Sequence, residues 1–127
     1  MKLRLAGAGD LALLVAAIGA DYFDRAHPAV PRPTPARISA IVAGALETAV
    51  VAIAEDPRYV GSVALRLAPW DWSDSLALCD RWLHVRRDRR GGSPVRHLVR
   101  FGLALARHRG VPLYIGAGFR GRSRVLR

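Results

Sequence analysis

The sequence predicts an α/β domain whose mixed sheet carries helices in the order β-α-α-β-β-β-α-β. Apolar residues recur at helical spacing at about 10–24, from Pro35 to Leu46, and from Ser93 to Gly110. Runs rich in apolar and β-branched residues, bounded by turn signals, predict strands between these segments. Because a helix joins the strand at 76–85 to the run "VPLYIGA", we expect those two strands to be parallel and adjacent.

The first half of the chain contains one strand and two helices. "KLRLA" alternates polar and apolar residues and predicts the first strand, and Asp10 suits the first turn of the helix that follows. The loop "HPAVPRPTP" at 27–35 is too rich in proline for either regular element. Thr34 and Pro35 then form an N-cap and first-turn pair for the second helix.

The second half contains the remaining strands and one helix. Segments 49–55, 59–67 and 76–85 are separated by "DP" and "WDWSDS" and predict an antiparallel meander. Ser93 is the expected N-cap of the third helix, with Pro94 at its first position and Gly110 beyond its end. "VPLYIGA" is the expected fifth strand, and the basic tail "GFRGRSRVLR" follows it.

Length and residue types set the broad class of protein. A chain of 127 residues suits a single domain over 1–127 with a real core. One cysteine, Cys79, excludes an internal disulfide, and the histidines lack zinc-site spacing, so we expect no metal and a reducing cytoplasm. Asp10 interrupts the apolar N-terminal run, which favours a helix of the folded domain over a signal peptide, and no membrane span is expected.

Positive charge is concentrated in the last third of the chain. Residues 1–80 carry seven basic and nine acidic side chains, whereas residues 81–127 carry thirteen arginines and only Asp88. This asymmetry indicates either a phosphorylated or polyanionic partner or a surface that keeps a protein of net charge +10 in solution.

The segment 83–99, "LHVRRDRRGGSPVRHLV", resembles the acetyl-coenzyme A binding motif of the GNAT-type N-acetyltransferase superfamily. In that motif a strand ending in Val passes through a turn with "RGxGxG" or "RxxGxA" into a helix. The spacing is matched by Val85, Asp88, Arg90, Gly91, Arg96 and Leu98. The likeness extends to the opening strand and helix, to "VVAIAEDPRYVGSVAL" with Gly61, and to "GVPLYIGA".

This resemblance implies a coenzyme site between the fourth and fifth strands. Backbone amides at a helix N-terminus bind pyrophosphate, and glycines permit its close approach. Pantetheine is expected to form hydrogen bonds with the strand backbone of Leu83, His84 and Val85. The expected phosphate cradle, to which Arg89 also contributes, consists of Arg90, Gly91, Gly92, Ser93, Val95 and Arg96.

Two departures from the family pattern bear on these expectations. Ser93 and Val95 replace the usual small residues, and Pro94 has no amide hydrogen to donate. The chain also ends at Arg127, without the usual last helix and two strands. We therefore expect the fifth strand to be an exposed edge and the protein to be a homodimer that covers it.

The resemblance implies a general base on or near the fourth strand, and Asp80 is the best match. Asp74, Asp71 and His84 are weaker candidates, and Asp80 could equally pair with Arg81 or Arg66. Tyr114 suits core packing better than the role of general acid, and Cys79 suits a buried apolar role. Trp70 and Trp72 could line an acceptor pocket or pack over the sheet.

Three functions therefore remain open at this stage. The favoured one is acetyl transfer from acetyl-coenzyme A to an unidentified amine. The alternatives are a catalytically inactive module with the same fold and a basic protein that binds nucleic acid or another polyanion. Nucleic-acid binding is less favoured, because a strand precedes the helix at Ser93 and no helix-turn-helix, RNA-recognition or zinc-finger pattern occurs.

Overall fold

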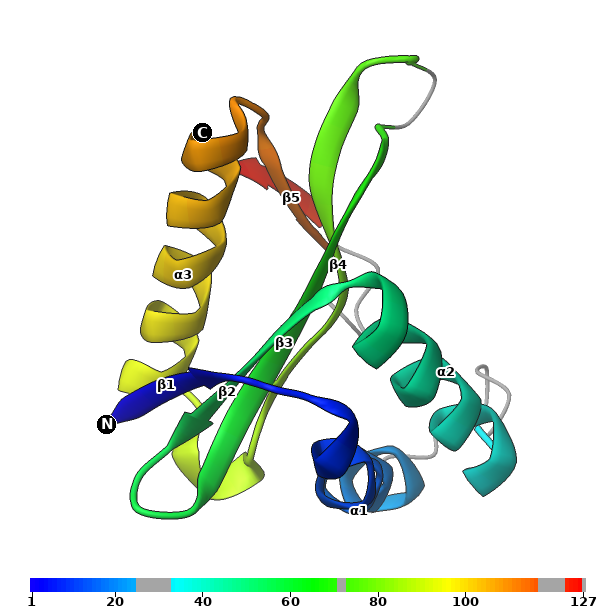
Figure 1. Cartoon of the computed structure of the whole chain (residues 1–127). Coiled ribbons are helices and arrows are strands. Elements are labelled where there is room, and N and C mark those ends of the chain that lie inside the picture. The colour runs from blue at the N-terminus through cyan, green and yellow to red at the C-terminus, as the bar shows by residue number, and fades with distance from the viewer. Residues whose placement is uncertain (25–32, 71–72, 117–122, 127) are drawn as a thin grey trace.

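The computed structural model describes residues 1–24, 33–70, 73–116 and 123–126 (Figure 1). Its sheet has six strands in the order β1-β2-β3-β4-β5-β6. Helix α3 covers one face of this sheet, and helices α1 and α2 cover the other (Figure 1). The elements are β1 (Lys2–Leu5), α1 (Leu11–Asp24), α2 (Pro35–Thr48), β2 (Val50–Glu55), β3 (Tyr59–Pro69), β4 (Leu76–Val85), α3 (Ser93–Arg109), β5 (Leu113–Gly116) and β6 (Ser123–Leu126).

The predicted order of elements is confirmed through β5. Strands β1 to β4 pair antiparallel with their neighbours, and β4 pairs parallel with β5 across the α3 connection. Two short 3-10 turns complete the path, η1 (Ala8–Asp10) before α1 and η2 (Arg87–Arg89) before α3. Asp10 thus lies just before α1, where its carboxylate accepts from the Gly7 amide at 2.9 Å.

The prediction that the fifth strand is an exposed edge was wrong. Strand β6 pairs antiparallel with β5, with Leu113 opposite Leu126 and Ile115 opposite Arg124. The backbone groups of an edge strand gain hydrogen bonds from such a neighbour. Apolar Val125 and Leu126 within the basic tail were the sequence signal for this strand.

Two apolar cores hold the helices to the sheet. On one face, Leu98 and Ala106 of α3 pack with Leu65 and Leu113 of the strands. On the other face, residues of α1 and α2 pack against β2, β3 and β4, among them Leu14, Ile18, Ile38, Val42, Ile53 and Trp82. The termini of β4 and α3 are therefore fixed from both sides, which positions the turn between them.

Glycine and capping residues set a close contact between strands and the starts of two helices. A Cβ added to Gly61 would lie 2.7 Å from the His84 carbonyl oxygen, so β3 approaches β4 closely only because this residue is glycine. Thr34 caps α2 as predicted, since its Oγ1 accepts from the Arg37 amide at 3.2 Å. The predicted cap at Ser93 was one residue too late, because Gly92 is the N-cap of α3.

The described residues include neither a membrane-spanning helix nor a metal-binding cluster. Within 1–24, 33–70, 73–116 and 123–126, no helix has the length and apolarity needed to cross a membrane. In the same part of the chain, no group of three or more His, Cys, Asp or Glu side chains is arranged to hold a metal ion.

Candidate active site

Strands β4 and β5 pair over a short length and then separate. The parallel ladder joins Leu78 to Leu113 and Cys79 to Tyr114, and from Asp80 onward β4 pairs only with β3 in the described part of the sheet. In this part of β4, the backbone groups of Leu83 and Val85 point away from β3 toward the gap, and they are available to an extended ligand except for the Val85 carbonyl, which accepts from Arg90 Nε. This is the segment expected from the sequence to bind pantetheine.

A β-bulge bends β4 at the point where the gap begins. Ala64 of β3 lies opposite Trp82 and Leu65 lies opposite Asp80, so Arg81 is the extra residue of β4. A bulge kinks its strand and increases the local twist. The bulge therefore accounts for the divergence of β4 from β5 immediately after Cys79.

Asp80 lies where the two strands part. Its Oδ1 accepts a hydrogen bond from the Gly116 amide of β5 at 2.9 Å. The carboxyl is half-buried, and burial raises its pKa above the ordinary value, while the Gly116 hydrogen bond opposes part of that rise. Among the described residues Asp80 forms no ion pair with Arg81 or Arg66. It is a carboxyl with a raised proton affinity beside the gap.

The turn that follows β4 presents the N-terminus of α3. Gly91 has φ +79°, a left-handed conformation that favours glycine, and Gly92 caps the helix. The amides of Gly92, Ser93 and Val95 have no acceptor within the helix, and Pro94, which is buried, has no amide hydrogen. Backbone amides and the helix dipole together make this turn suited to an anion.

Arg90 and Arg89 hold this turn in place through bonds within the protein. Arg90 donates from Nε to the Val85 carbonyl at 2.9 Å and from Nη2 to Asp21 Oδ2 at 2.6 Å. Arg89 donates to the carboxylate and the carbonyl of Asp56 at 3.2 and 2.9 Å. The side chains expected to contact phosphate thus brace the turn, and its backbone amides remain available.

Further arginines surround the turn from the solvent side. Arg86 pairs with Asp88 at 2.6 Å, with both side chains largely exposed. Arg87 and Arg96 are also exposed. The single carboxylate in this part of the chain is therefore already paired, which leaves the mouth of the turn positively charged.

His84 belongs to a buried polar network beneath the end of β4. Its Nε2 lies 2.5 Å from Asp21 Oδ2, and its Nδ1 lies 2.7 Å from the Tyr59 hydroxyl. The Tyr59 hydroxyl also contacts Ser62 Oγ at 2.8 Å, and Ser62 accepts from Trp82 Nε1 at 3.0 Å. Both ring nitrogens of His84 are therefore occupied by partners within the protein.

The network satisfies every polar group that it buries. Among the described residues, no buried side-chain N or O atom lacks a hydrogen-bond partner. Burial raises the pKa of the Tyr59 hydroxyl, and the negative charge of Asp21 raises it further, so Tyr59 is a neutral phenol. Sequence reasoning missed Asp21 and Tyr59, because they are distant from His84 along the chain and belong to no local motif.

A cavity of about 580 Å³ lies between α1 and the end of β4. Its lining combines Ala17, Ala20 and Asp21 of α1 with His84, Arg86, Arg87 and Asp88. The turn after β4 and α1 therefore border a shared hollow, and Asp21 of its lining also accepts a hydrogen bond from Arg90.

The other sequence candidates are spread around this region. Tyr114 of β5 contacts Trp70, with ring centroids 6.2 Å apart, so packing accounts for both aromatic rings. Asp74 is exposed in the β3–β4 connection, and Cys79 is half-buried on β4. Asp71 and Trp72 lie outside the described residues.

Solved structures similar to this chain include acetyltransferases. A GNAT family acetyltransferase from Brucella melitensis in complex with acetyl-CoA matches with TM-score 0.73 and 18% identity, over 98% of this chain and 86% of that chain. A predicted acetyltransferase from Clostridium acetobutylicum with acetyl-CoA matches with TM-score 0.71 and 15% identity, over 95% of this chain and 83% of that chain. The ribosomal-protein-alanine N-acetyltransferase from Brucella melitensis biovar Abortus 2308 matches with TM-score 0.67 and 18% identity, over 94% of this chain and 83% of that chain.

The chain therefore has the fold of the GNAT-type N-acetyltransferases, as the resemblance of residues 83–99 predicted. No protein-family model matches the sequence, and no curated protein sequence matches it. At identities of 15 to 18% the similarity establishes the fold, and the activity is a separate inference.

Proposed function

We propose that this protein is an N-acetyltransferase that takes the acetyl group from acetyl-coenzyme A and transfers it to an amine. The observation that carries the proposal is the separation of β4 from β5 immediately beyond Cys79, with Asp80 at its start and the N-terminus of α3 at its far end. One extended ligand that combines a thioester, a peptide-like arm and a pyrophosphate has groups suited to each part.

The binding roles follow from the groups that each segment offers. The backbone of Leu83 and Val85 forms hydrogen bonds with the amide groups of pantetheine along the gap. The amides of Gly91, Gly92, Ser93 and Val95 bind the pyrophosphate, and the exposed Arg96 side chain adds positive charge. Val95 packs partly against the α3-side core, so its β-branched side chain does not need to face the phosphates.

The chemistry requires one base and one leaving group. The amine nitrogen attacks the thioester carbonyl carbon and forms the N–C bond, and Asp80 accepts the proton that the nitrogen releases, directly or through a water. The C–S bond then breaks with its electron pair on sulfur, and the thiolate takes a proton from solvent. A carboxyl whose pKa is raised by burial is a stronger base for this step than an exposed aspartate.

The test is an acetyl-transfer assay that follows thiol release from acetyl-coenzyme A with a panel of amines. The parent protein is expected to release thiol in proportion to an acetylated product detected by mass spectrometry. Asp80→Asn is expected to lower kcat by about 100-fold or more while acetyl-coenzyme A binding persists. Unchanged turnover in Asp80→Asn would return Asp80 to a structural role.

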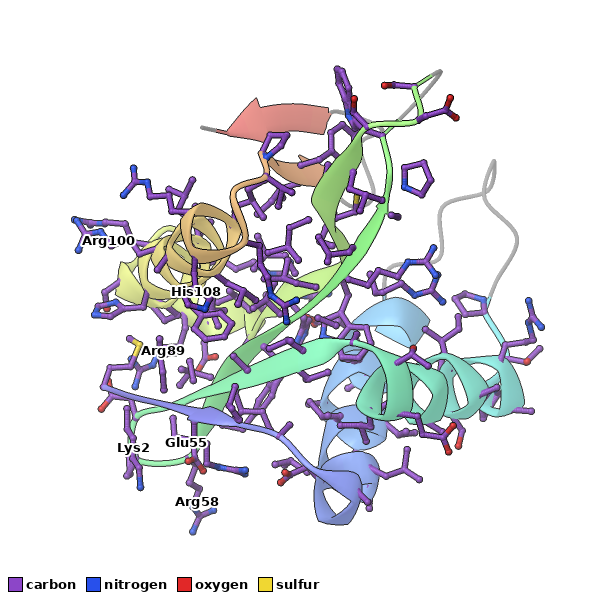
Figure 2. The ribbon with its side chains drawn as sticks, turned by 45° about the horizontal axis from the view of Figure 1, so that its top comes forward. Lys2, Glu55, Arg58, Arg89, Arg100 and His108 are labelled. Atoms are coloured by element: carbon purple, nitrogen blue, oxygen red, sulfur yellow. The ribbon has the colours of Figure 1, made fainter. Side chains whose placement is uncertain are left out.

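A second candidate function, polyanion binding, is favoured by the outer face of α3. This helix has no acidic residue, and Arg96, Arg100 and Arg107 are exposed along one side of it. Figure 2 shows Arg100 projecting from α3 away from the sheet. Such a face would attract phosphates without sequence preference, and its binding would weaken steeply with salt.

A further inference from the structure

A smaller cavity, of about 160 Å³, lies on the α1 and α2 side of β4. Its apolar lining comes from three elements and includes Ile18 of α1, Ile38 and Val42 of α2, and Trp82 of β4. Each of these four side chains is at least nine-tenths buried. The cavity therefore has a floor of packed core side chains and opens to solvent beside Arg37, Ile41 and Arg81, which are exposed.

Two arginines border the same cavity. Arg37 comes from the first turn of α2, and Arg81 is the bulge residue of β4. Both residues are exposed, and neither forms an ion pair with a carboxylate of the described residues. The described lining includes no acidic residue, so no carboxylate of this lining neutralises the positive charges of the two guanidinium groups at the apolar recess.

The cavity is adjacent to the candidate base. Arg81 follows Asp80 in the chain, and Trp82 of the cavity lining comes next. The bulge thus places Asp80 at the gap between β4 and β5 and Arg81 at the recess. The recess therefore lies next along β4 to the point where the strands part.

We propose that this recess binds the acetyl acceptor and that the acceptor is a free α-amino acid with an apolar side chain. The side chain occupies the apolar floor, the carboxylate lies between Arg37 and Arg81, and the amine faces Asp80. Guanidinium groups bind carboxylates through paired N–H donors, which gives both affinity and orientation. The proposal rests on the proposed N-acetyltransferase function.

The size of the recess limits the side chain. A volume of 160 Å³ equals about five water molecules of liquid volume, which is room for one side chain such as that of leucine or phenylalanine. The carboxylate requirement separates a free amino acid from the N-terminus of a peptide, where an amide replaces that carboxylate. Two guanidinium groups have no anion to bind in the peptide.

The experiment compares L-leucine with L-leucinamide and 3-methylbutylamine as acceptors, with acetyl-coenzyme A saturating. The expected result is a kcat/KM for leucine at least tenfold above those of the two amines that lack the carboxylate. Leucinamide has the less basic amine, so simple reactivity would favour it, and a preference for leucine reports recognition of the carboxylate.

Substitutions of the two arginines test which residues recognise the carboxylate of the acceptor. Arg81→Gln and Arg37→Gln are each expected to lower kcat/KM for leucine about tenfold, mainly through KM, and to leave leucinamide unchanged. Arg58→Gln is the matched control, because Arg58 is an exposed arginine in the β2–β3 turn at another end of the sheet (Figure 2). Its preference for leucine is expected to equal that of the parent.

The outcomes separate this proposal from the proposed function. Equal or better acetylation of leucinamide, or a preference for leucine that survives in Arg81→Gln and Arg37→Gln, would overturn the amino-acid acceptor while leaving acetyl transfer in place. Acetyl-coenzyme A binding with no transfer to leucine or phenylalanine would overturn it as well. If the parent protein does not bind acetyl-coenzyme A, that result would instead contradict the proposed function.

Discussion

At the scale of single residues, the ionised carboxylate of Asp80 is expected to support activity and to lower the stability of the fold. Its pKa is raised by burial, so folding favours the protonated carboxyl, and the ionised form costs stability above that raised pKa. Below the pKa of an unfolded aspartate both states are protonated and no cost remains. Asp80→Asn keeps an oxygen that accepts from the Gly116 amide, so it is expected to raise the melting temperature at pH 7 and leave it unchanged near pH 3.

Thermal denaturation of both proteins across this pH range provides the check. A melting temperature that falls at pH 7 in Asp80→Asn would show that the ionised carboxylate stabilises the fold. The same raised pKa predicts that kcat/KM declines on the acid side at a pH above the ordinary aspartate range, because the base must be ionised to accept a proton.

Asp21 is expected to be the main structural residue of the buried network. Its Oδ2 is the shared acceptor for His84 and Arg90, and its side chain is 12% exposed. Asp21→Ala leaves both partners without a carboxylate, so it is expected to lower the free energy of unfolding by about 3 kcal/mol in urea denaturation. Asp88→Ala, which breaks the exposed pair with Arg86, is the control and should cost less than about 1 kcal/mol.

A loss below about 1 kcal/mol in Asp21→Ala would contradict this account of the network. The network also marks the limit of sequence reasoning at this scale. The position of Asp80 was predictable, because it follows from strand register and from the family resemblance. The Asp21–His84–Tyr59 contacts were not predictable, because they depend on how α1, β3 and β4 pack together.

At the scale of elements, the turn into α3 is testable through Gly92. This N-cap has φ −105°, and an added Cβ would meet the Arg89 carbonyl oxygen at an ordinary 3.4 Å, so a side chain fits without backbone strain. Gly92→Glu is expected to weaken acetyl-coenzyme A binding by about tenfold relative to Gly92→Gln, because its carboxylate would face the pyrophosphate. Calorimetry measures both affinities.

The comparison of Glu with Gln separates charge from size. A carboxylate at a helix N-terminus also interacts favourably with the helix dipole, so weaker binding in Gly92→Glu would not reflect loss of the helix. Equal affinities of the two variants for acetyl-coenzyme A would contradict pyrophosphate binding at this turn. Gly91 is less suitable for the test, because its φ of +79° strains any other residue.

Element order was largely predictable, whereas element ends were less so. Helical periodicity and the alternation of strands gave the order through β5, and Thr34 and Gly110 marked helix ends. Strand β6 was missed because four arginines dominate the tail at 120, 122, 124 and 127, while only its pairing with β5 reveals the strand. The bulge at Arg81 was missed because register is a property of two strands together.

At the scale of the whole molecule, the homodimer stays a prediction, but an exposed edge at β5 no longer supports it. Strand β6 covers β5, so the outer backbone edges of the sheet belong to β1 and β6. Two chains of net charge +10 repel each other, so dimerisation is expected to strengthen as salt screens that repulsion. Light scattering at low and high salt tests this, and a monomer at every salt concentration would contradict it.

Salt also separates dimerisation from polyanion binding. Binding of single-stranded oligonucleotide to the outer face of α3 is expected to weaken as salt rises, opposite in sign to dimerisation. Arg100→Gln combined with Arg107→Gln should reduce the salt dependence of that binding. Oligonucleotide affinity that is unchanged by these substitutions would remove the α3 face as a binding surface.

The most direct test of the central claim is the thermal shift produced by acetyl-coenzyme A, compared with 3′-phosphoadenosine 5′-diphosphate, at 0.15 M salt. The nucleotide carries the phosphates without the pantetheine arm, so it measures what the turn into α3 contributes without the gap between β4 and β5. Binding along Leu83–Val85 predicts a larger shift for acetyl-coenzyme A, approaching about 2.7 kcal/mol of added stability at 100 times its Kd. Equal shifts for the two ligands, or no shift with either, would contradict a coenzyme site between β4 and β5.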